Sequence, residues 1–594
     1  MLHEEPNAVT KPDAREPLPE WYPGWARELA DLYFSGTTSM FVLHGNVHDL
    51  IECPGENSTR YCSLSEFLAE QLFGKWDIVL SYDLSRGLRA LAGSDSRRLQ
   101  QMMQSLTSRW GEPLTWPREP DKVLLGLDAF VERNLIEEPA QRKSVSLVFD
   151  YAQYLVPAGD LDSLSRGNGS RLVRFLHWAQ NPHIKRVNNC FCLIADKLSE
   201  INDRLLHSPH VATIEISLPD QKVREHYIQH STKDEDIKRL TDFTVEQLAK
   251  LSNGLSLTNL NVILAQAART SRRLDSKRFR QLKKSMIERQ CQGLVEFVEP
   301  GHTLDLVIGH DTAIERLKQD AAAIQKGESE TAPMGYLICG PVGTGKTFLA
   351  ECYAGSVGIP CVSLRNFRSK YVGETEGNLE QVLTVLRSLG PVLVIVDEAD
   401  ATLGNRQSSG DSGTSARVFS MIASQMGNTR YRGQIIWMLL TSRPDLLPID
   451  LKRQGRAEVH IPLFYPHDEA SVHAMFLAMA KKSKIPLKPE DVPAVDLKRK
   501  LSGADIESIV LSAKRQSFTA GRSDITKADL EQSLAEFIPS AQGLEKELQD
   551  LAAVLECTQL SFLPDEWREK VQKPDGRSRL QERMVAIRQL LEDG

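Results

Sequence analysis

Residues 335–354 read GYLICGPVGTGKTFLAECYA, and no other stretch restricts the fold of the chain as strongly. A short apolar run, YLIC, leads into a glycine-rich loop, and residues with helical periodicity follow at once. The loop satisfies G-x-x-x-x-G-K-[ST] through Gly340, Gly345, Lys346 and Thr347. Because strand, phosphate-binding loop and helix in this order belong to parallel α/β sheets, we predict an α/β fold for this region.

The loop has the chemistry needed to hold a nucleoside triphosphate with magnesium, so we predict ATP and Mg²⁺ as its ligands. Glycines let backbone amides turn towards phosphate oxygens, and the following helix adds the positive end of its dipole. Lys346 would neutralise charge on the β- and γ-phosphates, while Thr347 would hold Mg²⁺. The predicted ATP contacts in this segment are Gly340, Pro341, Val342, Gly343, Thr344, Gly345, Lys346, Thr347 and Phe348.

A pair of acidic residues follows further along the chain, in VLVIVDEAD (392–400). Asp397 ends an apolar strand-like run and is predicted to orient the water shell of the metal. Glu398 is placed to polarise the attacking water. A single acidic residue here could be only a helix N-cap after a core strand. Two of them downstream of a phosphate loop favour hydrolysis.

The length and composition of the chain limit its class. A chain of 594 residues is too long for one core, and about 150 residues per domain suggests roughly four compact units. The net charge of −7 gives no electrostatic reason to expect a nucleic-acid or membrane-surface protein. Without a secretory signal or a bilayer-spanning apolar run, we expect no membrane insertion and a cytoplasmic location. The nine cysteines are expected to be reduced thiols, and no zinc site is expected.

The pattern around Asp397 recurs faintly in the N-terminal half. SVSLVFDYAQ (144–153) parallels VLVIVDEADA (392–401), and residues 191–210 parallel residues 438–456 in the same order. In each copy short apolar strands alternate with helical patterns, and a purely helical stretch follows. We therefore predict two tandem modules, each a parallel α/β subdomain followed by a helical lid. The expected boundaries are a flexible leader (1–24), a degenerate α/β subdomain (25–220), its lid (221–298), an active α/β subdomain (299–466), its lid (467–540) and a C-terminal helical extension (541–594).

Three further segments of the second module resemble the AAA ATPase family. SKYVGETEGNLEQVL (369–383), TSRPDLLPIDLKRQGR (441–456) and SGADIE (502–507) match, in order, its pore loop, its second region of homology and its helical lid. Across the first module the resemblance is only topological. The plan of a degenerate module followed by an intact one resembles a group of tandem AAA proteins found in bacteria and encoded in chloroplasts.

The resemblance implies that Arg453 and Arg456 are arginine fingers, which reach the nucleotide of a neighbouring subunit and so require a ring. A planar guanidinium can stabilise charge on the transferring phosphoryl group. The alternative is that both arginines pair with surface carboxylates. The protein is therefore expected to form a homo-oligomer, with a hexameric ring as the expected form.

The same resemblance assigns further roles in the second module. Ser442 takes the place of the polar sensor, which is usually asparagine in the family. Ile308 and Gly309 stand where the adenine edge is contacted. The pore loop would consist of Lys370, Tyr371 and Val372, with the aromatic ring gripping an extended polypeptide, although Tyr371 could instead pack on its own module.

The first module lacks the corresponding catalytic groups. His207 and His210 stand in place of the two arginines, and neutral histidine cannot replace a permanent cation. The counterpart of the phosphate loop, FVLHGNVHDL (41–50), has one glycine and no lysine, and Tyr151 takes the place of Glu398. We therefore expect this module neither to hydrolyse ATP nor to complete a neighbour's site, and to act as a scaffold or recognition tier.

The expected function is that of an ATP-hydrolysing motor that remodels or threads a protein client through a central channel. A regulatory switch or scaffold without threading is the first alternative. A nucleic-acid motor or loader is the second, suggested by the basic segment RTSRRLDSKRFRQLKK (269–284). Phe279 is the only aromatic residue of that segment, so the stacking surface expected for single strands is missing.

Overall fold

The structure is a computed structural model that describes residues 18–54, 59–93, 95–111, 116–159, 164–232, 234–270, 273–326, 328–365, 372–403, 414–538 and 543–592. Contacts divide the chain into two compact units, Met1–Met286 with Glu376–Ser388, and Ile287–Thr375 with Leu389–Gly594. Among the described residues, no helix combines the length and the apolar character needed to cross a bilayer.

The first unit is built on a sheet with the strand order β5-β4-β6-β7-β1-β8. All neighbouring strands are parallel except β4 and β5, which a short turn joins and which therefore pair antiparallel. The interior strands are apolar along almost their whole length because both faces of a parallel sheet are covered. The strands are β1 (Met40–Gly45), β4 (Ile78–Asp83), β5 (Gly87–Ala90), β6 (Val145–Phe149), β7 (Asn189–Ala195) and β8 (Val211–Ile216), and a separate antiparallel pair comprises β2 (Ile51–Pro54) and β3 (Thr59–Cys62).

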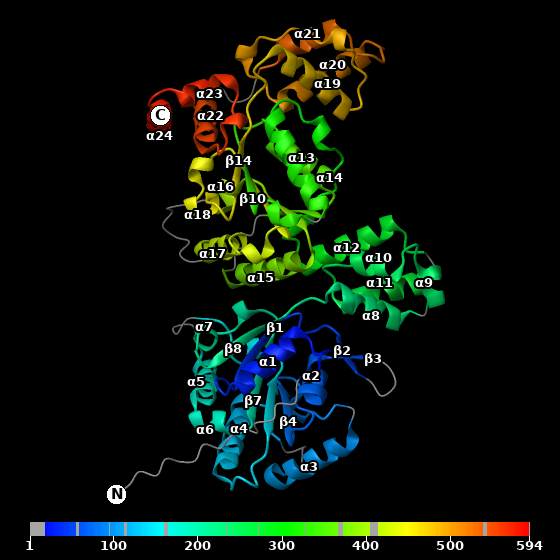
Figure 1. Ribbon diagram of the computed structural model, residues 1–594, viewed down its shortest axis with the longest axis vertical. Helices are drawn as coiled ribbons and strands as arrows, with labels where there is room; N and C mark the ends of the chain where they lie inside the picture. The colour runs from blue at the N-terminus through cyan, green and yellow to red at the C-terminus, as the bar shows by residue number, and fades with distance from the viewer. Residues whose placement is uncertain are drawn as a thin grey trace. The chain divides into compact units, whose positions relative to one another are not determined.

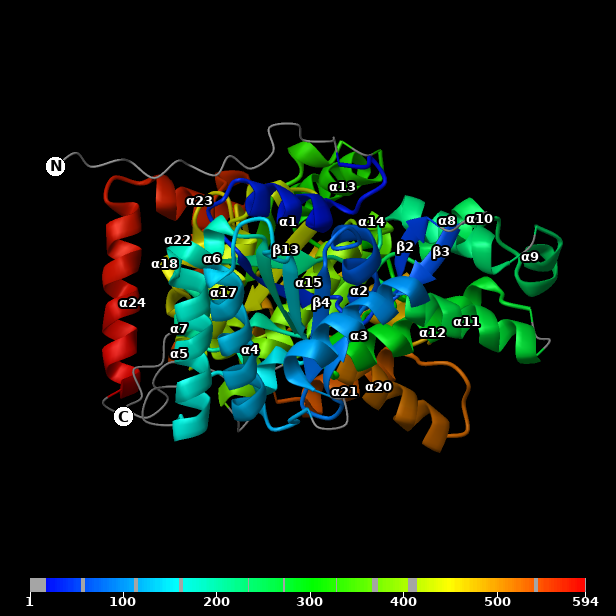
Figure 2. The same ribbon diagram turned by 90° about the horizontal axis from the view of Figure 1, so that it is seen from below.

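Helices cover both faces of this sheet. On one face, the apolar residues of α4 recur with helical spacing and pack with α5 around Phe175 and Trp178. Figure 2 shows α4, α5 and α6 side by side on this face. On the other face α1 and α2 pack around Phe41 and Phe67. The helices are α1 (Gly24–Phe34), α2 (Leu64–Phe67), α3 (Ser96–Trp110), α4 (Pro120–Ile136), α5 (Arg166–Gln180), α6 (Pro182–Arg186) and α7 (Asp203–Leu206), and a π-helical turn (Leu68–Leu72) continues α2.

A group of helices follows this sheet in the sequence. Asp220 caps the first of them through the Val223 amide, and Thr244 with Gln247 forms a capping box on the third. The guanidinium of Arg224 is buried and donates to the Ala249 carbonyl at 2.9 Å, which ties α8 to the end of α10. These helices are α8 (Gln221–Ser231), α9 (Asp234–Leu240), α10 (Val245–Leu251), α11 (Leu257–Thr270) and α12 (Ser276–Gln290).

The second unit contains a sheet with the order β14-β10-β13-β12-β11-β9. Its strands follow the same order as β8-β1-β7-β6-β4 in the first unit, and an antiparallel strand again lies at the outer edge. Two sheets of one topology confirm the predicted pair of α/β modules. The strands are β9 (Val295–Phe297), β10 (Gly335–Cys339), β11 (Cys361–Leu364), β12 (Val392–Val396), β13 (Ile435–Thr441) and β14 (Val459–Pro462).

Two helices of the second module, α13 and α14, are joined to β10 by hydrogen bonds. The Tyr336 hydroxyl donates to Asp320 at 2.8 Å and lies 3.3 Å from the Tyr353 hydroxyl, so a buried polar network joins β10, α13 and α14. In Figure 1, α19–α21 form one group beyond the sheet and α22–α24 form another. The helices are α13 (Asp311–Gln325), α14 (Lys346–Val357), α15 (Val372–Ser388), α16 (Ala399–Leu403), α17 (Thr414–Met426), α18 (Ile449–Lys452), α19 (Glu469–Lys482), α20 (Gly503–Thr519), α21 (Lys527–Glu536), α22 (Leu544–Glu556), α23 (Asp565–Gln572) and α24 (Gly576–Glu592).

Candidate active site

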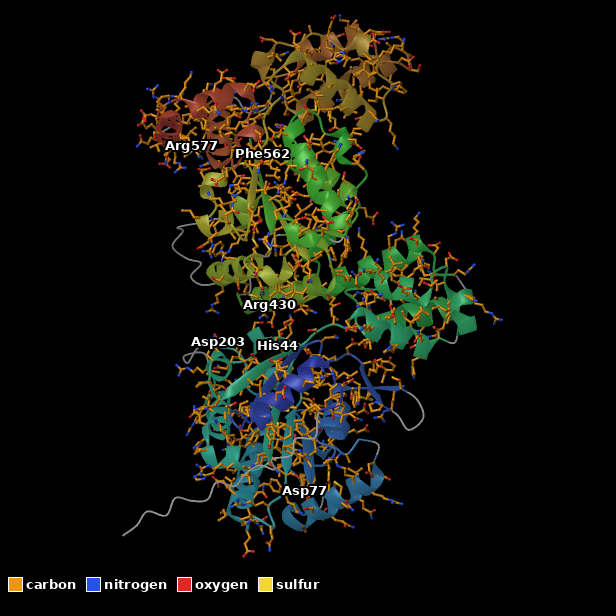
Figure 3. The ribbon with its side chains drawn as sticks, viewed as in Figure 1. His44, Asp77, Asp203, Arg430, Phe562 and Arg577 are labelled. Carbon is orange, nitrogen blue, oxygen red and sulfur yellow. The ribbon has the colours of Figure 1, made fainter. Side chains whose placement is uncertain are left out.

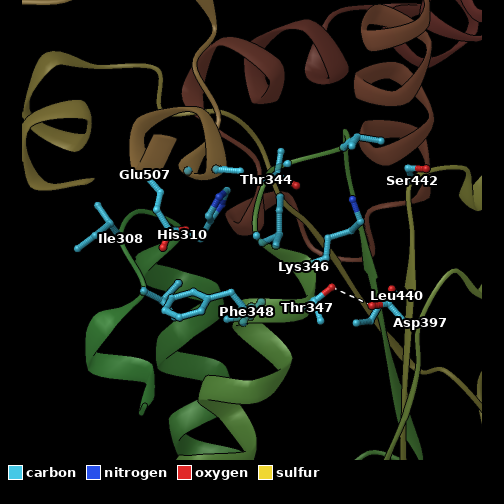
Figure 4. Close-up of a pocket in the computed structure, with 18 of the residues that line it drawn as sticks. Ile308, His310, Thr344, Lys346, Thr347, Phe348, Asp397, Leu440, Ser442 and Glu507 are labelled. Carbon is cyan, nitrogen blue, oxygen red and sulfur yellow. Dashed lines mark hydrogen bonds between the residues drawn. The ribbon is translucent and has the colours of Figure 1, made fainter. Parts of the chain in front are cut away.

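A cavity of about 530 Å³ lies in the second module between the glycine-rich loop, the ends of β12 and β13, and the lid helices α19 and α20. Most of the predicted ATP-binding loop lines it, from Val342 to Phe348, whereas Gly340 and Pro341 are not among the lining residues. Figure 4 shows Lys346, Thr347 and Asp397 together on one side, with Ile308, His310 and Phe348 on the other. The cavity therefore has one polar and one largely apolar part.

The loop backbone has a conformation that glycine allows and other residues resist. Gly340 has a φ of 146°, and a Cβ atom there would lie 2.2 Å from the Leu463 carbonyl oxygen. The ammonium group of Lys346 donates to the carbonyls of Gly340 at 2.8 Å and Pro341 at 2.9 Å. Burial lowers the pKa of Lys346, and the nearby Asp397 carboxylate opposes that shift. The loop thus presents backbone amides and one partly desolvated cation to the polar part of the cavity.

Thr347 and Asp397, the two predicted Mg²⁺ ligands, are in contact. The Thr347 hydroxyl donates to the Asp397 carboxylate at 2.9 Å, and the other carboxylate oxygen accepts from the Glu398 amide at 2.8 Å. Glu398 has a φ of 47°, a left-handed conformation that turns the chain sharply at the end of β12, and its side chain lines the cavity. The Asp397 and Glu398 carboxylates, with the Thr347 hydroxyl at the end of the phosphate loop, therefore form one acidic corner of the cavity.

The acidic corner suits Mg²⁺, which takes some of its ligands from water and phosphate. It does not suit a metal whose ligands are all protein side chains. Among the described residues, no group of three or more His, Cys, Asp or Glu side chains is arranged to hold an ion. Mg²⁺ keeps several waters and binds through one or two carboxylates together with substrate phosphates. The Thr347 hydroxyl and the Asp397 carboxylate match that requirement.

The end of β13 supplies the remaining polar residues. Ser442, which the sequence places at the sensor position, lines the cavity, and the neighbouring Thr441 donates to Asp400 at 2.6 Å. The Thr441 hydroxyl also accepts from the Arg443 amide at 2.9 Å. Sequence reasoning did not identify Asp400, although it follows two residues after Glu398 in the same DEAD stretch.

The apolar part of the cavity combines the entry segment with the lid. Ile308 lines it, whereas Gly309, with a φ of 75°, lies outside the lining. His310 lines it as well, and burial lowers its pKa to about 4. The ammonium group of Lys482 lies 5.4 Å from the centre of the Phe348 ring. Such a surface is suited to an aromatic base. The lid residues Met475, Met479, Lys482 and Glu507, which also line the cavity, were not predicted because helical periodicity does not show which face meets the loop.

The two predicted fingers lie away from the cavity of their own module. The side chain of Arg453 is 59% exposed, whereas that of Arg456 is 12% exposed. Arg456 donates to the Asp450 carbonyl at 2.7 Å, and the Asp450 carboxylate lies 3.7 Å from Arg453 and 3.8 Å from Arg456. Both arginines thus pair with Asp450, and Arg453 is the more exposed of the two.

The predicted pore loop cannot be placed. Lys370 and Tyr371 lie outside the described residues, and Val372 begins α15 with its side chain also outside them.

In the first module, side chains fill the position that corresponds to the acidic corner. Tyr151 has a φ of 55°, close to that of Glu398, which supports the correspondence of the two strand ends. The imidazole of His48 stacks on Tyr151 with 5.4 Å between ring centres and lies 2.6 Å from the Asp196 carboxylate. Burial raises the pKa of the adjacent Asp150.

The counterpart of the phosphate loop also contacts the first lid directly. Asp49, which is 5% exposed, accepts from the Leu257 and Thr258 amides at 2.8 Å each and from the Thr258 hydroxyl at 2.9 Å. These amides begin α11. At the same position of the second module, Gly503 and Ala504 begin α20 and line the cavity. A carboxylate of the chain therefore occupies the helix end that faces the cavity in the other copy.

The two histidines that replace the arginines face their own module. The His207 ring lies 2.8 Å from the Asp203 carbonyl, at the start of α7 (Figure 3). The His210 ring lies 2.8 Å from the Lys185 ammonium group.

Comparison with known protein families gives matches in both modules. Residues 336–465 match the model of the ATPase family associated with various cellular activities (AAA). Residues 12–217 match the N-terminal Rossmann-like domain of AAA+ chaperones, and residues 222–292 match their second helical domain.

Curated relatives agree with these matches. A cell division cycle protein 48 homolog of Archaeoglobus fulgidus is 26% identical, over 50% of this chain and 44% of its own length. An uncharacterized AAA domain-containing protein, ycf46, of Guillardia theta is 25% identical, over 52% of this chain and 62% of its own. The ATP-dependent zinc metalloprotease FtsH 3 of Sphaerobacter thermophilus is 31% identical, over 34% of this chain and 42% of its own.

The chain thus spans less than two thirds of the length of these relatives. The family matches nevertheless fall on both predicted modules, and the two sheets share one strand order. The chain therefore belongs to the AAA family, with a first module of the AAA+ chaperone type followed by an AAA module.

Proposed function

We propose that this protein is an oligomeric, Mg²⁺-dependent ATPase whose second module hydrolyses ATP in order to remodel a protein client. The observation that carries the proposal is the meeting of Lys346, the Thr347–Asp397 pair and Glu398 in one cavity. An AAA+ chaperone-type family is consistent with this use of ATP.

Each residue of the cavity has a defined task in this proposal. The amides of the loop and the Lys346 ammonium group bind the β- and γ-phosphates, and burial strengthens the attraction because few waters screen it. Thr347 and Asp397 hold Mg²⁺, which when bound offsets charge on the phosphates. Glu398 orients a water and accepts its proton, while Ser442, at the end of the neighbouring strand β13, contacts the nucleotide. Ile308 and Phe348 enclose the base.

The exposure of Arg453 supports hydrolysis between subunits. Its side chain is 59% exposed and does not line the cavity of its own module, so it is available to reach a nucleotide held by another copy. Arg456 is held against Asp450 and positions the turn that carries Arg453. A closed ring of identical subunits, with six as the proposed number, supplies each site with one such turn.

The basic segment of the first lid favours a protein client over nucleic acid. Phe279, its single aromatic residue, is 1% exposed and packs against Phe243 with 6.0 Å between ring centres. It therefore cannot stack on a nucleobase. Threading of the client by Tyr371 is the proposed mode, and a nucleotide-driven switch without threading is the second candidate.

The first module acts in this proposal as a fixed tier. Its counterpart of the phosphate loop has no lysine, and Asp49 already holds the start of the lid helix. Neither feature suits the binding of a triphosphate.

Glu398→Gln tests the proposed ATPase. This variant is expected to bind ATP with unchanged affinity while turnover falls about 10²- to 10⁴-fold, the range for loss of a general base. Lys346→Ala is the matched control and is expected to lose ATP binding itself. Equal turnover in Glu398→Gln and the unmodified chain would refute the assignment.

The mode of action needs a second comparison. Tyr371→Ala is expected to keep ATPase activity and lose the unfolding of a tagged model protein if threading is correct. Retained, nucleotide-dependent binding of one folded partner by Tyr371→Ala would favour the switch instead.

A further inference from the structure

The C-terminal extension is part of the structural core of the second module. Residues Leu548 to Val554 of α22 are buried without interruption. Phe562, labelled in Figure 3, is 4% exposed and belongs to the cluster under the α/β sheet. Arg577 donates to the Leu555 carbonyl at 2.7 Å and fastens α24 to the end of α22. The extension therefore holds α22 in a fixed position against the module.

At one point, α22 touches the phosphate loop. The Val342 amide donates to the side-chain carbonyl of Gln549 at 3.1 Å, and the Val342 carbonyl accepts from the Tyr465 hydroxyl at 2.8 Å. Gln549 is 4% exposed, so its side chain has little freedom to move away. Both backbone groups of one loop residue are thus held from outside the loop.

Two turns further along, α22 touches the segment that carries Arg453. Glu556 accepts from the Lys452 ammonium group at 2.9 Å, and these side chains are 20% and 12% exposed. Lys452 also donates to the Pro444 carbonyl at 3.0 Å and is the last residue of α18, directly before Arg453. Positions 549 and 556 are seven residues apart, about two helical turns, so both lie on one face of the helix.

The same helix also contacts the lid. The Asp550 carboxylate, which is 6% exposed, accepts from the Lys500 ammonium group at 3.1 Å. Lys500 has a φ of 43° and lies two residues before Ser502, the N-cap of α20. The loop, the lid and the turn that carries Arg453 are therefore joined to one rigid element.

We propose that α22 is a rigid link that sets the phosphate loop and the Arg453 turn of one subunit in a fixed relation. Gln549 and Glu556 are its positioning residues. Gln549 acts through Val342 on nucleotide binding in its own subunit. Glu556 acts through Lys452 on the placement of Arg453 and so on hydrolysis in the neighbouring subunit; this second role rests on the proposed function.

The test compares Gln549→Ala and Glu556→Gln in the full chain. Glu547→Gln is the matched control, since Glu547 lies on α22 in an exposed pair with Arg583 at 2.8 Å. Gln549→Ala is expected to weaken binding of a fluorescent ATP analogue about tenfold, the effect of losing one hydrogen bond between the buried Gln549 side chain and the Val342 amide. Glu556→Gln is expected to keep that affinity within about twofold and to lower kcat about tenfold. The control is expected to change neither quantity.

Mixed rings locate the effect of Glu556. Subunits with Lys346→Ala bind no ATP and serve only as donors of Arg453, so turnover comes from the unmodified partners. Adding Glu556→Gln to these donors is expected to lower turnover of the mixed rings further. The link is wrong if adding Glu556→Gln to the donors leaves the turnover of the mixed rings unchanged. It is also wrong if Gln549→Ala and Glu556→Gln each lower ATP affinity and kcat by the same factors.

Arg453→Ala separates failure of this link from failure of the proposed function. If it leaves turnover intact, the proposed hydrolysis between subunits is wrong, and the effect of Gln549→Ala on binding still tests the contact with the loop. If it abolishes turnover while Glu556→Gln matches the control, only the link is wrong.

Discussion

Asp49→Ala in the first module tests whether its lid is held by the chain itself. The Asp49 carboxylate accepts three hydrogen bonds from Leu257 and Thr258 at 2.8–2.9 Å and a fourth from the Asn46 side chain at 2.9 Å. Ser256 satisfies the next amide of α11, that of Asn259, at 3.0 Å. Removing the carboxylate leaves the first two amides of the helix without this acceptor.

The size of the effect follows from these contacts. Loss of a helix N-cap costs about 1–2 kcal/mol, and hydrogen bonds to a charged group contribute about 1.5–3 kcal/mol each. The bonds share one carboxylate, and water replaces part of them once the helix end opens. We therefore expect the free energy of opening the start of α11 to fall by about 2–4 kcal/mol. That change corresponds to amide exchange about 30- to 1000-fold faster.

Hydrogen exchange measured by mass spectrometry on the full chain gives the readout, in peptides that contain Leu257 and Thr258. Asp95→Ala is the matched control, because Asp95 caps α3 of the same module through the Arg97 and Arg98 amides at 2.9 and 3.0 Å. The control is expected to speed exchange in α3 and leave α11 unchanged. Unchanged exchange at α11 in Asp49→Ala, or protection of α11 by ATP in the unmodified chain, would refute the reasoning.

Three further changes test the second module. Arg453→Ala is expected to lower kcat about 10³-fold or more and to leave ATP affinity unchanged, as measured by steady-state turnover. Arg456→Ala is expected to lower kcat and also the melting temperature, because the Arg456 side chain is largely buried. Thermal melts check the second effect. Thr347→Ala is expected to raise the Mg²⁺ concentration for half-maximal turnover about tenfold, measured by Mg²⁺ titration. His310 has a pKa of about 4 in the fold against about 6.5 unfolded, so the unfolded chain binds more protons between these values. The free energy of unfolding should therefore fall by up to about 3 kcal/mol as pH drops from 6.5 to 4. In His310→Asn, the free energy measured by urea unfolding should lack this contribution to its pH dependence.

The sequence allowed the two sheets to be predicted because their strands are continuous apolar runs that end in recognisable residues. Asp150 and Asp397 close corresponding strands, and the structure gives both sheets one order. The AAA family, inferred from the motifs, is confirmed by the family matches. The antiparallel edge strands β5 and β9 were not predicted, since each is short and its direction depends on the turn or linker before it.

The contacts that shape the two sites were harder to predict because they join distant parts of the chain. Asp49 meets Thr258, and Val342 meets Gln549, in each case across about two hundred residues. Neither Asp49 nor Gln549 belongs to a motif, and a buried acceptor has the same appearance in a sequence as an exposed one. The roles predicted for Glu398, Arg453 and the remaining site residues stay predictions until the variants are measured.

Under the proposed function, the contact between Asp49 and the start of the lid helix α11 accounts for the missing catalytic groups of the first module. In the second module, Gly503 and Ala504, the first residues of α20, line the cavity, and in the part of the chain that the structure describes the start of this helix has its own Ser502–Asp505 capping box and no carboxylate cap like that of Asp49. In the first module Asp49 supplies that carboxylate. A triphosphate would have to displace a buried carboxylate, and the loop offers no lysine to offset the repulsion between the two negative charges. Under the proposed function, a site closed in this way has no transition state for a neighbour's guanidinium to stabilise, so the histidines at positions 207 and 210 would not reduce catalysis by the proposed ring. The proposed role of the first module as a fixed tier requires its lid to keep one position through every cycle of the second module, and the hydrogen bonds of Asp49 to the start of α11 agree with that requirement.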